Sequence, residues 1–382
     1  MNAAITPCSE AELQDVVKEA ASQSAPFRIS GGGTRANIGQ PVAGQTLSTN
    51  ALSGVDLYDP GALTLVVGAG TSIQDIEDTL AGEQQMLAFE PMDHRSLLGT
   101  NGAPTIGGVV AGNVSGPRRL QAGACRDALL GVRFVDGRGR QLKSGGRVMK
   151  NVTGLDLARL MCGAFGTLGV LSQVALKVLP RPERAATLVI DNLADAATVK
   201  VFCKALSTPF EVSGAASIDG RAYLRLEGLD VQVGDRLTRL REYLDEGGEV
   251  IDGDAHHALW RNIRDVRHFA DTGGSIWRVS VKPTDAPRLL TTVQRELDAK
   301  TSLDWGGGLV WIQVPQETSE SAAGVIRSAI GQGHATLIRA STELRQKTPV
   351  FQPESARLTK ISTQLRAQFD PHNILNPGLM AA

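Results

Sequence analysis

Cysteine is scarce in this sequence, which limits the metal and disulfide chemistry that the chain can support. Only four cysteines occur in 382 residues, at Cys8, Cys125, Cys162 and Cys203. They are widely spaced, without the short repeats that hold zinc or an iron–sulfur cluster and without the pattern of a disulfide framework. We therefore expect a protein of a reducing compartment that carries no iron–sulfur cluster of its own.

The sequence also lacks an excess of charge and any long hydrophobic run. Its 39 Lys and Arg and 40 Asp and Glu leave a formal net charge of −1, which gives no electrostatic basis for binding nucleic acid or an anionic membrane. No apolar stretch approaches the ~18 residues of a membrane-spanning helix. The N-terminus has no basic start followed by an apolar run, so we expect no signal peptide and a cytoplasmic protein.

Glycine is abundant, with 42 residues that gather in a few segments. The first segment runs from Pro26 to Arg35 and reads Pro-Phe-Arg-Ile-Ser-Gly-Gly-Gly-Thr-Arg. Three successive glycines let a ligand approach the main chain, and N–H groups that turn inward bind anions. Ser30, Thr34 and Arg35 add two hydroxyl groups and a fixed positive charge. By itself this segment indicates a pyrophosphate site and a plain glycine-rich turn equally well.

Three further motifs follow in order along the chain. Two are glycine-rich, Thr105–Gly116 and Cys162–Val170, and the last is the ending Phe369–Gly378, which contains Asn-Pro-Gly. With the first segment, this series resembles the vanillyl-alcohol-oxidase type of flavoproteins, whose FAD domain is called the PCMH type. The resemblance extends over nearly the whole chain.

A Rossmann dinucleotide site competes with this interpretation. In the run 66–73, Gly68 and Gly70 match the first two glycines of the fingerprint, and Glu90 stands about 20 residues beyond, where a ribose-binding acid would lie. Ile73 occupies the third position, which needs Gly or Ala so that helix and strand pack closely. A tight turn between a strand and a helix is therefore the favoured interpretation.

The expected fold class is α+β. It comprises a PCMH-type FAD-binding domain at residues 1–180, an α/β cap at 181–340, and a C-terminal segment at 341–382 that by resemblance returns to the FAD domain. Two successive βαββαβ patterns predict that the cap consists of two ferredoxin-like halves with an antiparallel sheet. The expected cap strands are 186–190, 211–218, 222–227, 249–251, 276–281, 301–305, 309–314 and 334–339, and the helices are 195–206, 232–245, 285–299 and 319–331.

The resemblance implies that the cofactor is FAD. Some relatives bind it covalently, through a His in or near the first loop or through a Cys. Thr34 and Arg35 stand in that part of the loop here, so we expect noncovalent FAD, with Cys125 as the one nearby residue that could form such a bond or else pack as a small buried hydrophobe. The residues expected to bind FAD are Ser30, Gly31, Gly32, Gly33, Thr34, Arg35, Thr105, Ile106, Gly107, Gly108, Asn113, Ser115, Gly116, Gly123, Asp127, Gly166, Gly169, Val170 and Asn376.

Oxidation of a 2-hydroxy acid further needs a cation for the carboxylate and a base near the hydroxyl group. Arg278 and Arg339, on predicted cap strands, are candidates for the cation, with a solvated sheet face as the alternative. His334 and His372 are candidates for the base, with a strand start and a turn as the alternatives. We take Arg278, Arg339 and His334 as the candidate catalytic residues.

Adjacent histidines at His256 and His257 raise the question of a metal site. Neighbouring residues on a helix do not face one another, and no nearby Cys or acidic pattern completes a ligand set. We therefore expect no metal. Some hydroxy-acid-oxidising relatives hold a metal with paired cap histidines, and the lack of a matching arrangement weakens the case for substrate oxidation by this chain alone.

Three shorter sequence motifs point to a particular group within this family. Trp277–Ser280, Asp304–Gly308 and His334–Arg339 are similar to segments of the FAD-binding subunits of bacterial glycolate oxidase. That likeness implies oxidation of glycolate to glyoxylate in a complex with a homologous catalytic flavin subunit and an iron–sulfur subunit, which would bring the protein to the inner membrane as a peripheral component. A self-sufficient FAD-dependent hydroxy-acid or alcohol oxidoreductase, and a flavin relay or structural subunit without turnover, are the alternatives.

Overall fold

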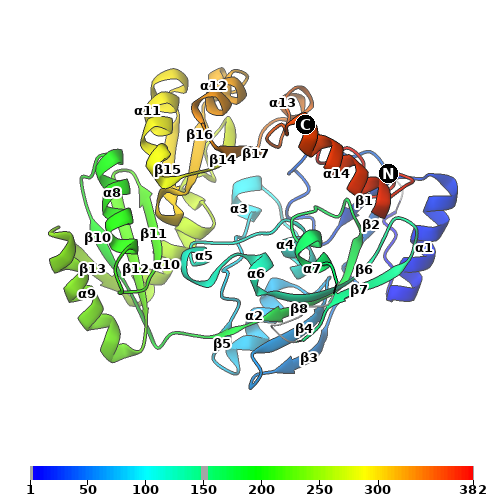
Figure 1. Ribbon diagram of the computed structural model, residues 1–382, viewed down its shortest axis with the longest axis horizontal. Helices are drawn as coiled ribbons and strands as arrows, with labels where there is room; N and C mark the ends of the chain where they lie inside the picture. Colours follow the sequence, from blue (N-terminus) through cyan, green and yellow to red (C-terminus); the bar gives the residue numbers. More distant parts are fainter. Residues whose placement is uncertain (1–2, 148–153, 382) are drawn as a thin grey trace. The chain divides into compact units, whose positions relative to one another are not determined.

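Contacts divide the chain into two units in this computed structural model, which describes residues 3–147 and 154–381 (Figure 1). Unit 1 comprises Met1–Ser115, Gly123–Arg181 and Pro353–Ala382, and unit 2 comprises Gly116–Ala122 and Pro182–Gln352. The domain boundaries at residues 180 and 340 stay predictions, because contacts do not show that either part folds alone.

A five-stranded antiparallel sheet forms the centre of unit 1, in the order β3-β4-β8-β6-β7. Every residue of its second strand is buried, as expected for a short apolar run inside a sheet. An antiparallel sheet is incompatible with the parallel βαβ unit of a Rossmann site. The strands are β3 (Val55–Asp59), β4 (Thr64–Gly68), β6 (Leu129–Val135), β7 (Gln141–Gly145) and β8 (Val170–Lys177).

Two short strand pairs complete unit 1: β1 (Phe27–Ser30) runs parallel to β2 (Gln45–Ser48), and β5 (Gln85–Met86) pairs with β9 (Leu179–Pro180). The end of the chain joins the first pair. The N–H of Phe27 donates to the carbonyl of Ile374 at 2.7 Å, and the N–H of Asn376 donates to the carbonyl of Phe27 at 3.1 Å. These bonds attach the Asn-Pro-Gly ending to the strand that leads into the first glycine segment.

Helix α1 (Glu10–Gln23) begins after Ser9, whose side chain accepts a hydrogen bond from the N–H of Glu12. The turn at Gly68 and Gly70 is a close backbone crossing, because a Cβ on either glycine would lie 2.3 or 2.2 Å from a carbonyl oxygen of a neighbouring segment. The other helices of unit 1 are α2 (Ile73–Ala81), α3 (Arg95–Leu98), α4 (Ile106–Ala111), α6 (Cys125–Ala128), α7 (Leu157–Met161) and α14 (Ala356–Phe369).

Part of the second glycine segment is helical. Thr105 caps helix α4 with a side chain that accepts from the N–H of Gly108 at 3.4 Å. Glycine disfavours helices in general, but a Cβ on Gly107 would lie 2.7 Å from the carbonyl oxygen of Ala69. Tertiary packing therefore selects glycine here in spite of its low helix propensity.

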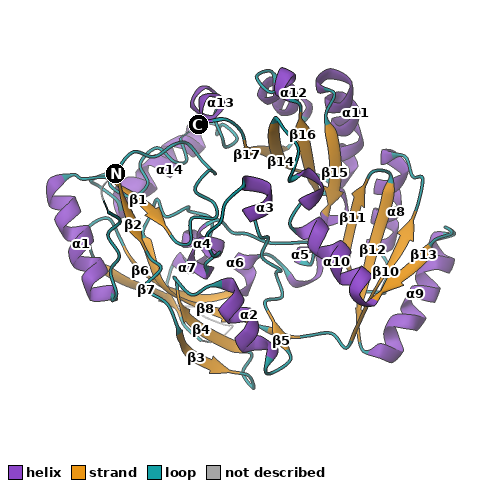
Figure 2. Ribbon diagram, turned by 180° about the vertical axis from the view of Figure 1, so that it is seen from behind, coloured by secondary structure: helices purple, strands orange, loops and turns teal. Residues whose placement is uncertain are grey.

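Unit 2 is built on one eight-stranded antiparallel sheet, in the order β13-β10-β12-β11-β15-β16-β14-β17 (Figure 2). Each half has the order 4-1-3-2 when its strands are numbered along the chain, and the halves join through their second strands, β11 and β15. The strands are β10 (Arg184–Ile190), β11 (Val212–Ile218), β12 (Arg221–Gly228), β13 (Glu249–Asp252), β14 (Ser275–Val281), β15 (Lys300–Asp304), β16 (Leu309–Val314) and β17 (Gly333–Arg339).

Helices pack against both sheet faces in unit 2. The main core joins the strands to the buried sides of α8, α9, α11 and α12, and a smaller cluster around Trp260 of α10 lies elsewhere on the sheet. None of the helices within the described ranges is long and apolar enough to cross a bilayer. The helices are α5 (Arg119–Ala122), α8 (Asp195–Leu206), α9 (Asp230–Leu244), α10 (Gly253–Arg264), α11 (Ala286–Leu297), α12 (Ala322–Ala329) and α13 (Thr342–Lys347), with short 3-10 turns at Arg267–Phe269, Pro283–Asp285, Trp305–Gly307 and Gln316–Thr318.

Candidate functional site

A cavity of about 320 Å³ in unit 1 brings the sequence motifs together. All three glycine-rich segments and the Asn-Pro-Gly ending contribute to its wall. A concave site of this kind, lined by main chain and a few polar groups, is typical of a cofactor site. The expected FAD residues on the wall are Ser30, Gly31, Gly32, Gly33, Thr34, Arg35, Thr105, Gly107, Gly108, Gly166, Gly169 and Asn376.

Much of the remaining wall was not anticipated from the sequence. These residues are mostly small or apolar. Arg28, Ile29, Ala111, Gly112 and Phe165 lie inside the glycine-rich segments, and Ala36 to Val42 directly follow the first one. Extending that segment by seven residues would have found four of them. The unanticipated wall residues are Arg28, Ile29, Ala36, Ile38, Gln40, Val42, Thr49, Ala69, Ala111, Gly112, Phe165, Leu171 and Leu379.

Glycine is required at the three positions of the first segment for different structural reasons. A Cβ on Gly32 would lie 1.5 Å from the carbonyl oxygen of Ala103, and one on Gly31 would lie 2.2 Å from Oγ1 of Thr105. Gly33 has a φ of +73° and open space around its Cβ position. The first two glycines therefore let two glycine-rich segments touch, and the third forms the turn beside the cavity.

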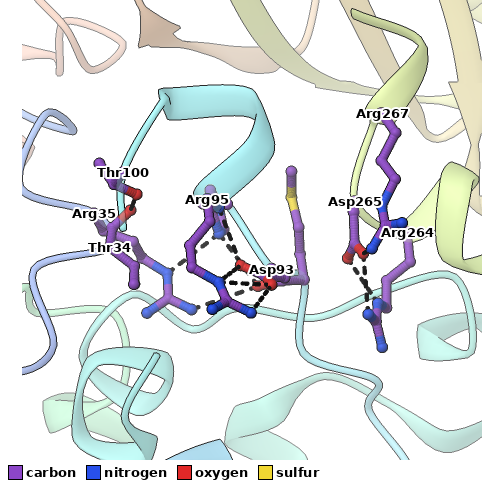
Figure 3. A network of polar contacts seen from close by, with 10 residues as sticks. Thr34, Arg35, Asp93, Arg95, Thr100, Arg264, Asp265 and Arg267 are labelled. Atoms are coloured by element: carbon purple, nitrogen blue, oxygen red, sulfur yellow. Dashed lines mark hydrogen bonds and ion pairs between the residues drawn. The ribbon is translucent and has the colours of Figure 1, made fainter. Parts of the chain in front are cut away.

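Arg35 places a buried cation on the cavity wall. Its Nε donates to Nδ1 of His94 at 3.3 Å, and its Nη2 donates to the carbonyl of Met92 at 3.5 Å. Figure 3 shows it beside Asp93, whose carboxylate also pairs with Arg95 at 2.7 Å. Burial lowers the pKa of Arg35 to about 10, and Asp93 opposes that shift. The guanidinium thus stays charged at neutral pH, in a place where an anionic ligand would neutralise it.

Asn376 joins the C-terminal ending to two other parts of the cavity wall. Its Oδ1 accepts from the N–H of Ile29 and its Nδ2 donates to the carbonyl of Phe165, both at 2.8 Å. The residue is 3% exposed and has a φ of +47°, a conformation that Asn tolerates better than most residues. Its side chain therefore holds β1 and the third glycine segment in place.

Replacing Asn376 with alanine is expected to lower the free energy of unfolding of the full chain by roughly 2–4 kcal/mol, because two buried backbone groups lose their partners. Thermal unfolding followed by circular dichroism measures this change. Asn50→Ala, at an exposed side chain, is the matched control and should have little effect. Equal stability of the two variants would contradict a structural role for Asn376.

Several expected FAD residues lie away from the cavity wall. Oδ1 of Asn113 accepts from the N–H of Arg126 at 3.2 Å, and Oγ of Ser115 accepts from the N–H of Cys125 at 2.9 Å. Such bonds attach the 113–115 stretch to α6. The contact of these residues with FAD stays a prediction. The residues in question are Ile106, Asn113, Ser115, Gly116, Gly123, Asp127 and Val170, of which Gly116 belongs to unit 2 and Ile106 and Val170 are fully buried.

The thiol of Cys125 is buried and is expected to be unreactive. It is fully inaccessible to solvent, and a hydrogen bond with Cys162, together with burial, raises its pKa well above the usual range. Nucleophilic reactions of cysteine require the thiolate. A protonated thiol in this position favours packing over covalent attachment of a cofactor.

A second set of candidate residues meets in unit 2, on the sheet face opposite the main core. Trp277 and Val279 belong to that core, so the alternation of the strand directs Arg278 and Ser280 the other way. Ser280 pairs with His334 on β17. Because opposite residues of an antiparallel pair share a face, Arg278 and His334 lie on the same side.

Trp305 is the centre of this set. The guanidinium of Arg278 lies 5.0 Å from the centroid of its ring, and that of Arg119 lies 4.4 Å from it. Burial, and next the charge of Arg119, lower the pKa of Arg278 to about 10, and the buried carboxylate of Asp304 opposes that shift. His334 is exposed, but partial desolvation and next the charges of Arg278 and Arg119 lower its pKa as well. The cluster is therefore cationic, with a histidine that stays neutral at neutral pH.

The structure gives Arg339 a different environment. Its Nη1 donates to the carbonyls of Phe269 and Ala270 at 3.1 and 2.9 Å, and its Nη2 donates to both the carbonyl and the Oγ1 of Thr272. The guanidinium thereby fixes the turn at residues 269–272. These bonds give both terminal nitrogens of Arg339 protein partners, which favours a structural role, and its assignment as a carboxylate ligand stays a prediction.

The histidine pair on α10 also has a structural explanation. His256 is 2% exposed, and its Nδ1 lies 2.9 Å from Oγ1 of Thr187, which also accepts from Nε1 of Trp260. In the part of the chain that the structure describes, no group of three His, Cys, Asp or Glu side chains is arranged to hold a metal ion. His372, the other candidate base, is exposed.

Comparison with known proteins adds independent information. A family model described as an FAD binding domain matches residues 1–145. The chain is 36% identical over 371 residues to glycolate oxidase subunit GlcE of Escherichia coli (strain K12), which covers 97% of each chain. It is 29% identical over 190 residues to glycolate oxidase subunit GlcD of Bacillus subtilis (strain 168), covering 49% of this chain and 39% of that protein. Among solved structures, p-cresol methylhydroxylase with bound substrate aligns with a TM-score of 0.74 over 99% of this chain and 88% of its own, and its 16% identity indicates a shared fold alone.

Proposed function

We propose that this chain, which belongs to the family of PCMH-type FAD-binding flavoproteins, is the FAD-binding subunit of a glycolate oxidase complex that oxidises glycolate to glyoxylate. The observation that carries the proposal is the likeness to the GlcE subunit along 97% of both chains. The homologues are FAD-linked oxidoreductases that act on hydroxy acids, which confirms FAD and the general enzyme class.

The cavity of unit 1 fits such a cofactor. Gly33 leaves open space at its Cβ position, and Nη1 of Arg35 lies 3.2 Å from where a Cβ on Gly108 would be. Side chains at these glycines would fill the space that a pyrophosphate needs beside the buried cation. Thr34 and Arg35 replace the histidine of covalent relatives, and the protonated thiol of Cys125 is a poor nucleophile, so FAD is held noncovalently.

Bound FAD would supply the two-electron acceptor for the hydride that leaves C2 of glycolate. The residues of unit 2 would handle the rest of the substrate. Arg278 binds the carboxylate, because a guanidinium matches it with two parallel hydrogen bonds. His334, kept neutral by its lowered pKa, accepts the hydroxyl proton as the C–H bond breaks.

The partners follow from the same likeness. A homologous catalytic flavin subunit, similar to GlcD, and an iron–sulfur subunit would receive the electrons. A flavin relay without turnover remains the second candidate, favoured by the absence of paired metal-binding histidines among the described residues of the cap.

The first experiment is an anaerobic titration of the purified full chain with glycolate. A yellow flavin spectrum that bleaches supports direct oxidation by this chain, and a flavin that stays oxidised supports the relay. Acid precipitation separates the two binding modes, since noncovalent FAD appears in the supernatant. A folded protein without flavin overturns the proposal.

The acid limb of the flavin-reduction rate is expected below pH 6.5, the usual pKa of histidine, because His334 must be neutral to accept a proton. Arg278→Gln removes a positive charge that lowers this pKa, so the limb should move to higher pH. The measurement is the rate of bleaching against pH for wild type and variant. An unchanged limb in the variant, or an acid limb above pH 6.5 in wild type, would contradict the assignment of His334.

A further inference from the structure

The segment Gly116–Ala122 belongs to unit 2, although the residues on either side of it in the sequence belong to unit 1. Polar contacts link it to other residues of unit 2. Arg118 meets Glu227 of β12 twice, with Nη2 to Oε1 and Nη1 to Oε2 both at 2.7 Å. Nε1 of Trp305 donates to the carbonyl of Gly116 at 3.0 Å. Leu120 of α5 also packs against the main core of unit 2, so apolar and polar contacts together fix where the segment lies.

The pair between Arg118 and Glu227 is unusual because it is buried. The two side chains are 8% and 6% exposed, and Arg225 approaches the same carboxylate with Nε at 3.3 Å. Removing charges from water costs so much that a buried pair often adds little net stability over apolar packing. A positional role accounts for its presence better than a contribution to stability.

What the pair positions is the next residue, Arg119. Its guanidinium lies 4.4 Å from the centroid of the Trp305 ring, the same ring that Arg278 approaches to 5.0 Å. Trp305 itself has a φ of +52°, and its N–H donates to Oδ1 of Asp304 at 2.7 Å. Such a conformation is unfavourable for a bulky residue and is typical of functional sites.

We propose that Arg119 is the second cation of the carboxylate site and that Glu227 is a positioning residue, which sets Arg119 beside Arg278 by holding Arg118. The inference deepens the proposed function and rests on it for the identity of the substrate. Two like charges at one ring repel, as the effect of Arg119 on the pKa of Arg278 indicates. An anion between them relieves this repulsion, so the site selects small carboxylates over uncharged alcohols.

The test measures anion binding separately from chemistry. Isothermal titration of the FAD-loaded full chain with oxalate, which has no C–H bond to oxidise, gives the affinity of the site, and ethylene glycol serves as the uncharged probe. Stopped-flow reduction at increasing glycolate concentration separates apparent binding from the rate of reduction. Variants are Glu227→Gln, Glu227→Asp, Arg119→Gln and the double variant, with Glu211→Gln as the control at an exposed ion pair of the same unit.

We expect Arg119→Gln to weaken oxalate binding at least 30-fold and Glu227→Gln at least 10-fold, since interactions of a charged group typically cost this much when lost. In stopped flow, the apparent affinity for glycolate should fall in the same order. Glu227→Asp should recover part of the affinity, and the double variant should resemble Arg119→Gln. Glu211→Gln should match wild type, and ethylene glycol should bind far more weakly than oxalate.

Three results would overturn the inference: no oxalate binding by wild type, unchanged affinity in Arg119→Gln, or a Glu227→Gln variant that loses thermal stability while its oxalate affinity stays the same. Arg119→Gln leaves the buried pair intact, so the test does not depend on the folding of the Glu227 variants. Oxalate binding that responds to the variants, without reduction by any hydroxy acid, would refute the proposed oxidation and leave the anion site standing.

Discussion

Gly32→Ala is expected to abolish FAD binding and to lower the free energy of unfolding by about 3 kcal/mol or more, at the upper end of the cost of overpacking. The new Cβ would lie 1.5 Å from the carbonyl oxygen of Ala103. That atom belongs to backbone, which cannot rotate away as a flexible side chain can. The first glycine segment must then move away from the stretch just before the second, and both glycine segments contribute to the cavity wall.

The measurement for Gly32→Ala is the ratio of flavin to protein absorbance in the purified variant, together with its thermal midpoint. A loss of 3 kcal/mol corresponds to a fall of roughly 4 °C for a protein of this size. Gly82→Ala is the matched control, because Gly82 ends α2 with a helical φ of −58° and its nearest atom would be 3.6 Å away. If Gly32→Ala keeps its full flavin content and the thermal midpoint of wild type, the close approach at Gly32 is not needed for FAD binding or for stability.

Much of the architecture could be predicted from local sequence pattern. The family, its α+β FAD-binding fold and the positions of the cap strands were all accessible, and the helix expected at 195–206 has the bounds Asp195–Leu206 in the structure. Apolar strands bounded by turn residues, and helices with a buried stripe, carry this information in a few consecutive residues. The same holds for the first glycine segment, whose composition alone marks a special backbone.

What the sequence did not reveal depends on residues that are distant along the chain. Arg278 and Arg339 occupy similar positions on predicted strands, yet only the fold shows that Arg339 donates to carbonyls of the turn at residues 269–272. Arg119 carries no motif, and its approach to Trp305 spans nearly half of the chain. Long-range hydrogen bonds and ring contacts of this kind are set by topology, so local propensity cannot separate a binding arginine from a structural one.

Arg278→Met should lower the second-order rate of flavin reduction by glycolate about 100- to 1000-fold while leaving FAD content unchanged. A half-buried guanidinium that pairs with a carboxylate contributes about 2–5 kcal/mol when its partner is present, and 1.4 kcal/mol corresponds to a factor of ten. Methionine keeps an apolar stem against Trp305, so the variant removes charge more than volume. Arg278→Lys should fall in between, because an ammonium group retains the charge but cannot form two parallel bonds.

The control for Arg278→Met is Arg295→Gln, at a guanidinium on α11 whose side chain is 71% exposed. Stopped-flow reduction of both variants under anaerobic conditions gives the comparison, with ethylene glycol (1,2-ethanediol) as the poor, uncharged substrate that lacks the carboxylate. If Arg278 binds the carboxylate, the variant should lose its preference for glycolate over the diol, because the charge that distinguishes them is gone. If Arg278→Met reduces its flavin with glycolate within threefold of the wild-type rate, the carboxylate binds elsewhere. If the variant loses the same factor with both substrates, Arg278 contributes to the shape of the site and not through its charge.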